Sequence, residues 1–193
     1  AMNRTDKPPR DGANLRGISG GLLNAPLSNT SYTEFTSDTN VNVGDRTKLN
    51  TVSGDRQKPG TLRLLANNDI NAWDYVEVDS GGAVALPIAF SLINGTANVA
   101  AVEVGENADL WSDGDIEMSA RTDARMNART QVSTYGLAGA GWGGSAAILN
   151  ARNLVTVRDG ADFDAGRNIY LLAGTERMGE INHFDLDAKT DIW

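Results

Sequence analysis

A Val-x-Val triplet occurs three times in the chain, and a matching set of residues follows each copy. The triplets begin at Val41, Val102 and Val155, so their starts lie 61 and 53 residues apart. The first copy carries an insertion near residues 50–59 that the second copy lacks, and without it the period is about 53 residues in both intervals. A repeat of this length constrains the fold strongly, because each unit must pack against its neighbours in an equivalent way.

Other landmarks keep the same phase as the triplets. A large apolar residue follows each triplet six positions later, at Leu49, Leu110 and Phe163. A glycine-containing turn and a second alternating segment come next, as TLRLLA, DIEMSA and NIYLLA. A glycine-rich block precedes each triplet by about 20 residues, as GGLLNAPLS, GGAVALPIA and GLAGAGWGG. We therefore expect the chain to start and to end within a repeat.

The repeating unit is predicted to consist of β-strands. Apolar and polar residues alternate in VEVGENADL and IEMSA, which is the period of a half-buried strand. Gly, Asp and Asn stand between these segments and tolerate the positive φ angles of tight turns. The stretch DARMNARTQ has helical propensity, but its equivalents INAWDYVEV and EINHFDLD resemble strands, so its place in the repeat predicts a strand.

Strands within a repeated unit predict an all-β fold, a parallel β-helix or β-solenoid. A β-sandwich is the alternative, although it gives no reason for a repeat of about 53 residues. At about 20 or more residues per coil, each repeat would supply two or three coils. We expect residues 20–193 to form the solenoid and residues 1–19 to be an N-terminal segment that begins with a cloning remnant. The glycine-rich blocks either complete coils or project from them as hairpins.

Alternation also predicts which side chains fill the interior. Stacking coils about 4.8 Å apart buries one face of every strand and pairs the backbone groups. The side chains expected to point inward are Val41, Val43, Leu49, Leu62, Leu64, Val102, Val104, Leu110, Ile116, Met118, Val155, Val157, Phe163, Ile169 and Leu171.

The charge balance and the residue content argue against several classes of protein. With 17 basic against 25 acidic residues the formal charge is −8, so no nucleic acid is expected as a partner. No apolar run reaches the roughly 20 residues that a membrane span requires, so no membrane insertion is expected. Cysteine is absent, which removes disulfides and a cysteine nucleophile. The segment AMNRTDKPPR lacks a signal-peptide core, so we expect a fragment whose targeting signal lies outside it.

The segments VEVGENADLWSDGDIEMSA and VTVRDGADFDAGRNIYLLAG resemble repeats of filamentous-haemagglutinin-like adhesins, a family of very large bacterial surface proteins. The resemblance covers the chain from about Gly20 onward. It implies a long right-handed β-helical stalk on a cell surface or in a secreted matrix. It supplies no catalytic residues, and none is assigned from it.

Acidic residues gather on the turns and are candidate ligands for calcium. Asp113 and Asp115 lie in SDGD, and Asp159, Asp162 and Asp164 lie in RDGADFD. Clustered carboxylates supply the hard oxygen ligands that Ca²⁺ prefers. Neither an EF-hand loop nor the glycine-rich calcium nonapeptide is present, so solvated turns are the competing interpretation. Calcium is the one candidate cofactor.

Aromatic residues form a second candidate site, a surface for sugars. Trp73 and Tyr75 share a strand face, and Trp111 is expected to point outward by alternation. Aromatic rings bury a large apolar area, which suits the flat apolar faces of sugars. Packing of the rings on the flank of the solenoid is the competing interpretation.

Catalysis is not expected. Carboxylate sets such as Asp74, Glu77 and Asp79 can be assembled, but any repetitive acidic surface offers them. His183 is the only histidine, which argues against a multi-histidine site. The segment GAGWGG has a dinucleotide-binding spacing, yet its equivalents in the repeat lack those glycines.

These features predict a structural or adhesive β-solenoid segment of a large secreted or cell-surface bacterial protein. A carbohydrate-binding or polysaccharide-modifying β-helix and a calcium-stabilised surface module are the alternatives. Glycans or proteins of a host or a matrix are the expected partners. Uncapped coil ends are expected to favour end-to-end self-association.

Overall fold

The computed structural model describes residues 2–6, 13–23, 28–55, 57–177 and 179–193, which form an all-β solenoid of parallel strands. The prediction of a parallel β-helix is confirmed. Within these ranges, no helix has the length and apolarity needed to cross a bilayer. The strands are β1 (Met2–Asp6), β2 (Leu15–Leu23), β3 (Ser28–Val43), β4 (Lys48–Thr51), β5 (Leu62–Ala85), β6 (Ile88–Val104), β7 (Asp109–Ser112), β8 (Ile116–Gly139), β9 (Trp142–Val157), β10 (Asp162–Ala165), β11 (Ile169–Ala173) and β12 (His183–Ile192).

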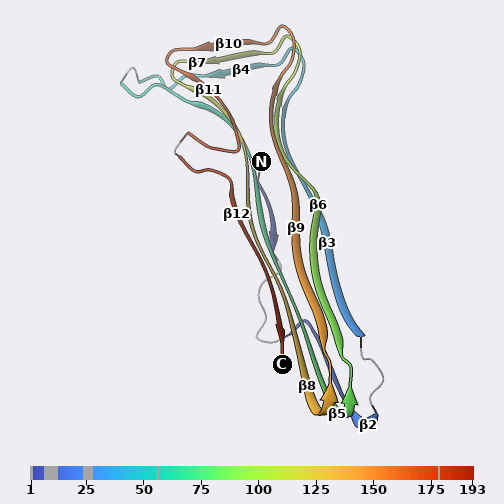
Figure 1. Cartoon of the computed structure of the whole chain (residues 1–193). Helices are drawn as coiled ribbons and strands as arrows, with labels where there is room; N and C mark the ends of the chain where they lie inside the picture. Colours follow the sequence, from blue (N-terminus) through green and yellow to red (C-terminus); the bar gives the residue numbers. More distant parts are fainter. Residues whose placement is uncertain (1, 7–12, 24–27, 56, 178) are drawn as a thin grey trace.

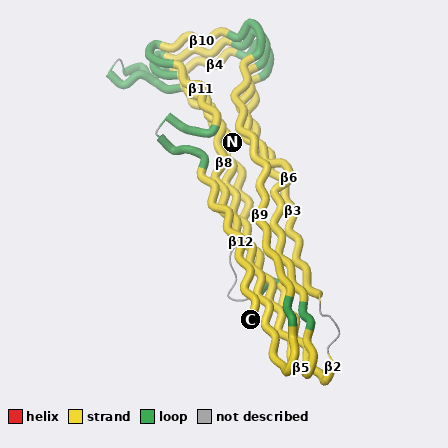
Figure 2. The backbone as a smooth tube through the Cα atoms, viewed as in Figure 1, coloured by secondary structure: helices red, strands yellow, loops and turns green. Residues whose placement is uncertain are grey.

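Each coil is a flattened loop with two long sides and one short side. The chain runs along β5, reverses at a sharp corner, returns along β6 and crosses through β7 to the start of β8 (Figure 1). Equivalent sides stack into three sheets (Figure 2). Sheet A contains β1, β2, β5, β8, β11 and β12, sheet B contains β3, β6 and β9, and sheet C contains β4, β7 and β10. Sheets A and B are the long sides, and sheet C closes the end opposite the sharp corner.

One repeat forms one coil, so the expectation of two or three coils per repeat is wrong. Leu62 pairs with Ile116 and Ile116 pairs with Ile169, at spacings of 54 and 53 residues. β5 alone has 24 residues, which makes one side of the coil about 80 Å long at about 3.3 Å per residue. Alternation identified the strands, but it gave no measure of how far each one continues before the chain turns.

The coils are numbered along the chain, and the second (residues 62–115) and third (116–168) are complete. β1 to β4 form the first coil, and β11 and β12 begin a fourth. Within residues 1–19, expected to precede the solenoid, both β1 and the first part of β2 pair with β5 in sheet A. Ala1, at the start of the expected cloning remnant, lies outside the described residues. The insertion forms the loop between β4 and β5.

The second and third glycine-rich blocks complete the coils rather than projecting as hairpins, and the first block runs through residues 24–27, which lie outside the described residues. β5 ends at Ala85 and β6 begins at Ile88, so the corner between the long sides is very tight. Neighbouring corners stack so closely that a Cβ at Gly136 would overlap the carbonyl oxygen of Gly82. Glycine is needed there because the two backbones approach each other directly. The segment GAGWGG leads into a strand, β9, and not into the helix that a dinucleotide site requires.

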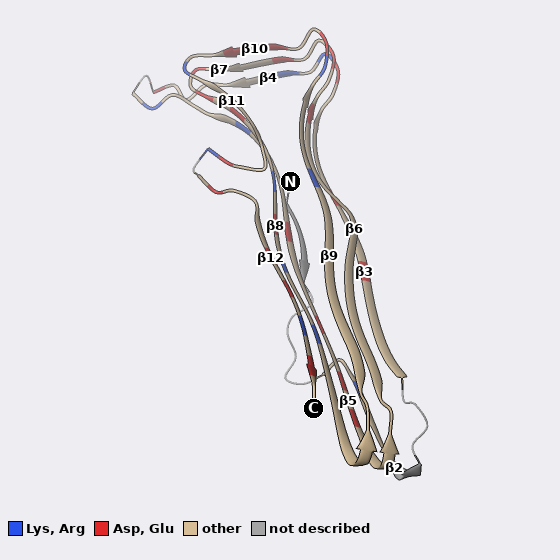
Figure 3. Ribbon diagram, viewed as in Figure 1, with Lys and Arg blue, Asp and Glu red and all other residues tan. Residues whose placement is uncertain are grey.

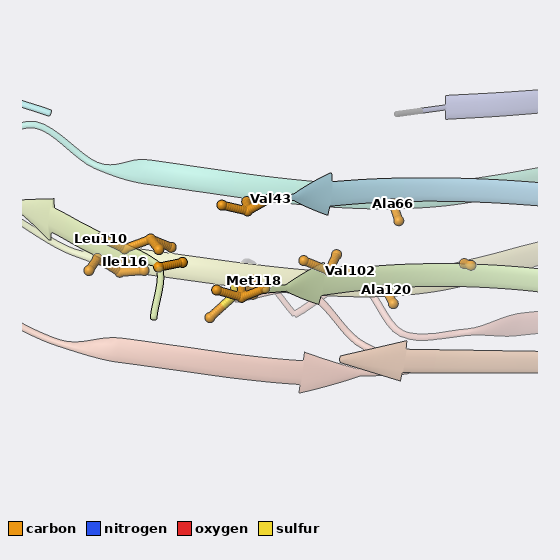
Figure 4. Close-up of a cluster of buried hydrophobic side chains, with 10 residues drawn as sticks. Val43, Ala66, Val102, Leu110, Ile116, Met118 and Ala120 are labelled. Carbon is orange, nitrogen blue, oxygen red and sulfur yellow. The ribbon is translucent and has the colours of Figure 1, made fainter. Parts of the chain in front are cut away.

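The largest apolar cluster lies where sheet C meets the two long sheets (Figure 4). Leu110 and Met118 are fully buried in it. The side chains predicted to point inward belong to this cluster, apart from Val157, Ile169 and Leu171, which are 38–52% exposed. These three lie on edge strands of the stack, where no further described strand covers them.

Between the two long sheets, small apolar clusters alternate with hydrogen-bonded polar layers. In one layer the Thr39 hydroxyl donates to Asn68 Oδ1. In another, the hydroxyls of Ser31 and Ser91 donate to the Asp74 carboxylate at 2.8 and 2.7 Å. Buried polar groups are stable only when they are hydrogen-bonded, so these contacts favour one alignment of sheet A against sheet B.

Candidate functional site

The predicted aromatic pair lies on the outer face of sheet A. The ring centroids of Trp73 and Tyr75 are 6.0 Å apart, and the rings meet edge to face at 65°. The guanidinium of Arg129, the neighbour of Tyr75 on β8, lies 5.1 Å from the Tyr75 ring centroid. The Tyr75 hydroxyl donates to Gln131 Oε1 at 2.9 Å. The pair is half-buried and held on several sides, so it presents a fixed apolar surface with polar groups beside it.

The environment of Tyr75 also fixes its charge state. Burial raises the pKa of Tyr75, and the carboxylate of Glu77 raises this pKa further. An ordinary tyrosine is already protonated at neutral pH, and this shift widens that margin, so the phenol is neutral and donates its proton to Gln131. Because the Tyr75 hydroxyl hydrogen is already donated to Gln131 Oε1, the group left to donate to an uncharged polar ligand such as a sugar is the side-chain NH2 of Gln131.

Trp111 does not join this surface. It lies on β7 in sheet C, beside Asn50 of β4 and Asp164 of β10. The structure therefore brings two of the three predicted aromatic contacts together and places the third on a different side of the coil.

The carboxylates of Asp74, Glu77 and Asp79 do not form one site. Asp74 is fully buried and faces the interior, whereas Glu77 and Asp79 lie on the outer face. Arg16 Nη2 lies 3.5 Å from Glu77 Oε1 and 3.3 Å from Asp79 Oδ2. Alternate residues of a strand point to opposite faces, which separates the even-numbered acid from the two odd-numbered ones.

Asp113, a calcium candidate, holds the insertion loop. Its carboxylate accepts hydrogen bonds from the backbone N–H groups of Ser53 at 3.0 Å and Gly60 at 2.6 Å. The Ser53 N–H contributes most to lowering the pKa of Asp113, against the smaller opposing effect of desolvation. These donors occupy oxygens that a calcium ion would need.

Asp115, the next candidate, holds the loop 174–182 against sheet A. Its buried carboxylate accepts hydrogen bonds from Asn168 N at 3.1 Å, Asn168 Nδ2 at 3.0 Å and Arg177 Nη1. Burial acts to raise the pKa of Asp115, but the bonds from Asn168 and Arg177 together outweigh it, so the pKa is lowered. The Arg177 guanidinium also lies 4.6 Å from the Tyr170 ring centroid. The guanidinium of Arg177 therefore holds the loop through two partners, the Asp115 carboxylate and the Tyr170 ring.

A polar cavity of about 250 Å³ lies beside this loop, lined by Thr61, Arg63, Glu117 and Arg177. Glu117 accepts hydrogen bonds from Arg63 Nε at 2.9 Å and from Arg177 N at 3.3 Å. Arg177 in turn faces Asp115, so both guanidiniums already have a carboxylate partner. The balanced charges give this cavity little field for an ionic ligand. The repeat pattern does not indicate this cavity, because Arg177 lies in a loop outside the repeating landmarks.

The remaining calcium candidates lie in the turn between β9 and β10 and on β10 itself. Asp162 stands beside Asp109, and Asp164 stands beside Trp111. Asp159 lies in the turn before them. Over the described ranges, no group of three or more histidine or acidic side chains is arranged to hold a metal ion. The five candidates are thus distributed along the chain path, and two of them are engaged by loops.

An apolar groove on the outer face of sheet B was missed by the sequence analysis. Thr30, Phe90 and Gly144 pair across the three strands of this sheet, so a ring lies beside a position with no side chain. The groove measures about 330 Å³ and is lined by Thr30, Tyr32, Phe90, Ser91, Leu92, Gly144, Ser145 and Ala146. Aligning the three strands by their repeat positions would have revealed the apolar outward residues.

No protein-family model, curated protein or solved structure matches the chain. The most informative features are the register of the coils, the paired rings on sheet A and the apolar groove on sheet B.

Proposed function

We propose that this chain is a structural and adhesive β-solenoid segment of a large secreted or cell-surface bacterial protein. The observation that carries the proposal is the register of the coils, in which Val41, Val102 and Val155 stand side by side on sheet B. Equivalent residues fill equivalent positions in successive coils, as in proteins that use stacked repeats as an extended framework. The resemblance to repeats of filamentous-haemagglutinin-like adhesins supports the same proposal.

Each coil is much longer along its sides than the distance by which it lengthens the stack. A coil of 53 or 54 residues advances the stack by one strand spacing, about 4.8 Å. Its longest side, β5, extends about 80 Å in the same coil. Coils of about 20 residues would make a longer stalk from the same chain. We therefore propose that the solenoid presents wide faces for contact rather than holding a tip at a distance.

Removing one coil tests the structural part of this proposal. Deleting residues 62–115 joins Thr61 to Ile116, which is the register partner of Leu62. If each coil is an interchangeable unit, the shortened chain should keep a β-type circular dichroism spectrum and a cooperative, lower-temperature melt. Deleting residues 116–168 is the matched control and should behave in the same way. Unfolding of both shortened chains under conditions where the full chain folds would contradict the proposal.

A carbohydrate-binding β-helix is the second candidate, and the Trp73–Tyr75 pair favours it. The edge-to-face rings and the neighbouring amide of Gln131 are suited to stacking on a sugar and bonding its hydroxyls. Titration calorimetry against a panel of neutral glycans tests this candidate. Trp73→Ala should abolish binding, and deletion of the third coil should weaken it because Arg129 and Gln131 are lost. Substitution of Val52, a 65% exposed residue of the loop between β4 and β5, is the control and should leave binding unchanged. Binding unaffected by Trp73→Ala would place any sugar site elsewhere.

The proposed location has its own test. Antibodies raised against the folded chain should label intact, unpermeabilised cells of the source organism or its secreted matrix. Labelling that appears only after permeabilisation would contradict a surface role and would leave the coil-deletion result unaffected.

A further inference from the structure

Three equivalent stretches of the sequence contain no charged residue. They are residues 17–33, 80–102 and 130–151, in a chain with 17 basic and 25 acidic residues. The second and third stretches run from the end of a sheet A strand through the glycine-rich corner and into the sheet B strand that follows, and the first stretch covers most of β2 and the start of β3. Figure 3 shows the result, with the corner end of the sheet B strands free of the red and blue segments seen elsewhere.

Large apolar side chains are exposed on the sheet B side of this region. Tyr32, Phe90, Trp142 and Ile148 are 43–55% exposed. The apolar patch comprises these four residues together with Leu92 and Ala146, and it surrounds the groove of about 330 Å³. Exposed patches of this kind are typical of interaction surfaces.

We propose that a second copy of this chain covers the apolar patch, with sheet B of one copy packed face to face on sheet B of the other. Each copy carries a formal charge of −8, so two copies repel each other wherever their charged faces approach. The patch is the least charged part of this outer face, and Glu34, which accepts a hydrogen bond from the Tyr32 hydroxyl at 3.0 Å, lies at its margin. Two sheets pack about 10 Å apart when their facing side chains interdigitate.

The patch has both a hollow and projecting side chains, so its shape allows two copies of the patch to pack together. Gly144 lies against the Phe90 ring, so closely that a Cβ there would stand 2.9 Å from Phe90 Cδ1. On the same strand Trp142 and Ile148 project on either side of the small residues. A two-fold axis presents the same surface from both partners, which lets projecting side chains of one copy enter the groove of the other.

The outer face of sheet A is a poor alternative for this contact. It carries ion pairs such as Arg16 with Asp79 at 3.3 Å and Arg129 with Asp191 at 3.4 Å. Covering these groups would remove them from water at a cost that exposed pairs recover only in part. Pairing through sheet B leaves them solvated.

A bilayer surface is the competing occupant, and it would use a different set of residues. Leu137 is 95% exposed and Tyr135 is 64% exposed, and both lie on β8, on the sheet A side of the same corner. Lipid around the corner would contact both sides, whereas a second copy on sheet B contacts one side. A lysine at position 137 therefore separates the two occupants.

Sedimentation velocity between about 1 and 100 μM tests the pairing. The wild-type chain should form a concentration-dependent dimer, and Trp142→Lys and Ile148→Lys should each weaken dimerisation at least about tenfold. Leu137→Lys is the matched control on the other side of the corner and should leave dimerisation unchanged. All three side chains are more than half exposed, so the circular dichroism spectrum should be preserved.

Several outcomes would overturn the pairing. A wild-type chain that stays monomeric throughout, or a dimer indifferent to both Trp142→Lys and Ile148→Lys, contradicts it. Equal loss of dimer in Leu137→Lys also contradicts it. A monomeric chain that co-sediments with phosphatidylcholine vesicles, and loses this with Leu137→Lys, would assign the region to a lipid surface instead. The pairing does not depend on the proposed surface role.

Discussion

Two parts of one strand, the start and the middle of β5, lie in two different kinds of interior. Near Leu62 and Leu64, where sheet C joins the long sheets, the interior is filled by large apolar side chains such as Leu110. Near Asp74, where only sheets A and B face each other, polar layers separate small apolar clusters. We refer to these as the three-sided region and the two-sided region.

The difference shows how one chain divides two tasks. Burial of apolar area has no preferred direction, so the three-sided region supplies stability without fixing how the sheets align. Hydrogen bonds are directional, and a buried polar group that loses its partner is costly. The two-sided region therefore selects the register between sheets A and B, whereas the three-sided region holds the coil closed.

The largest expected effect tests the three-sided region. Leu110→Ala removes a fully buried side chain and should lower the free energy of unfolding by about 3–5 kcal/mol, from lost transfer energy and a residual cavity. Its stack partner Leu49 is only partly buried at the edge of the cluster, so Leu49→Ala should cost about half as much. Urea unfolding followed by circular dichroism measures both. Equal losses of unfolding free energy in the two variants would mean that the second coil is no better packed than the first.

The next effect tests the two-sided region. Asp74→Ala leaves the donors of Ser31, Ser91 and Asn14 without their carboxylate acceptor and should cost about 2–4 kcal/mol. Asp74→Asn keeps one acceptor oxygen and should cost less. Amide hydrogen exchange should show the loss of protection in β5 and β6 around the substitution, with sheet C little changed. A loss of protection spread evenly over the solenoid would show that the two regions do not behave differently.

Acid should lower the stability that Asp115 contributes through its hydrogen bonds from Asn168 and Arg177. Because the folded-state pKa of Asp115 is lowered, its contribution is present above about pH 4 and is lost as the pH falls through that pKa. Asp115→Asn should therefore be less stable than the wild type by about 1–2 kcal/mol at pH 7, and this gap should narrow at pH 3. Unfolding in urea at the two pH values measures it. A larger stability difference between the wild type and Asp115→Asn at pH 3 than at pH 7 would contradict this expectation.

A smaller gain is expected at a turn beside sheet C. Arg46 has a φ of 57°, in the left-handed region, while the equivalent position in the third coil is Gly160 with a φ of 71°. Arg46→Gly should stabilise the chain by about 0.5–1 kcal/mol, since glycine adopts this conformation without a Cβ clash. Asn107, with a φ of 55°, tolerates the same region better, so Asn107→Gly should gain less. A destabilised Arg46→Gly would show that the arginine side chain contributes more than the strain it causes.

The smallest expected effect is that of calcium. Asp113 already accepts hydrogen bonds from Ser53 and Gly60, and Asp115 accepts them from Asn168 and Arg177, so millimolar Ca²⁺ should move the midpoint of thermal unfolding by no more than about 1 °C. Melts with Ca²⁺ and with chelator provide the comparison. A clear rise in the midpoint would restore the calcium-stabilised module, with Asp159, Asp162 and Asp164 as the first residues to substitute.

Much of the fold was accessible from the pattern of residues. Alternation placed most inward side chains correctly, and repeat position overrode helical propensity in the segment that became part of β8. The candidate sites were less accessible. Trp73 and Tyr75 share a face because they are two apart, but the loops that engage Asp113 and Asp115 lie outside the repeat.

The residue pattern alone indicates the class of fold, the equivalence of Val41, Val102 and Val155, and the glycines at the described corners. These follow from local chemistry, since side-chain period and permissive φ angles act over a few residues. Only the tertiary structure decided that one repeat makes one coil, that Asp74 is inside while Glu77 is outside, and that apolar residues from three strands form one patch. Such facts depend on where the chain turns and which strands become neighbours, which is settled by packing between residues more than 50 positions apart.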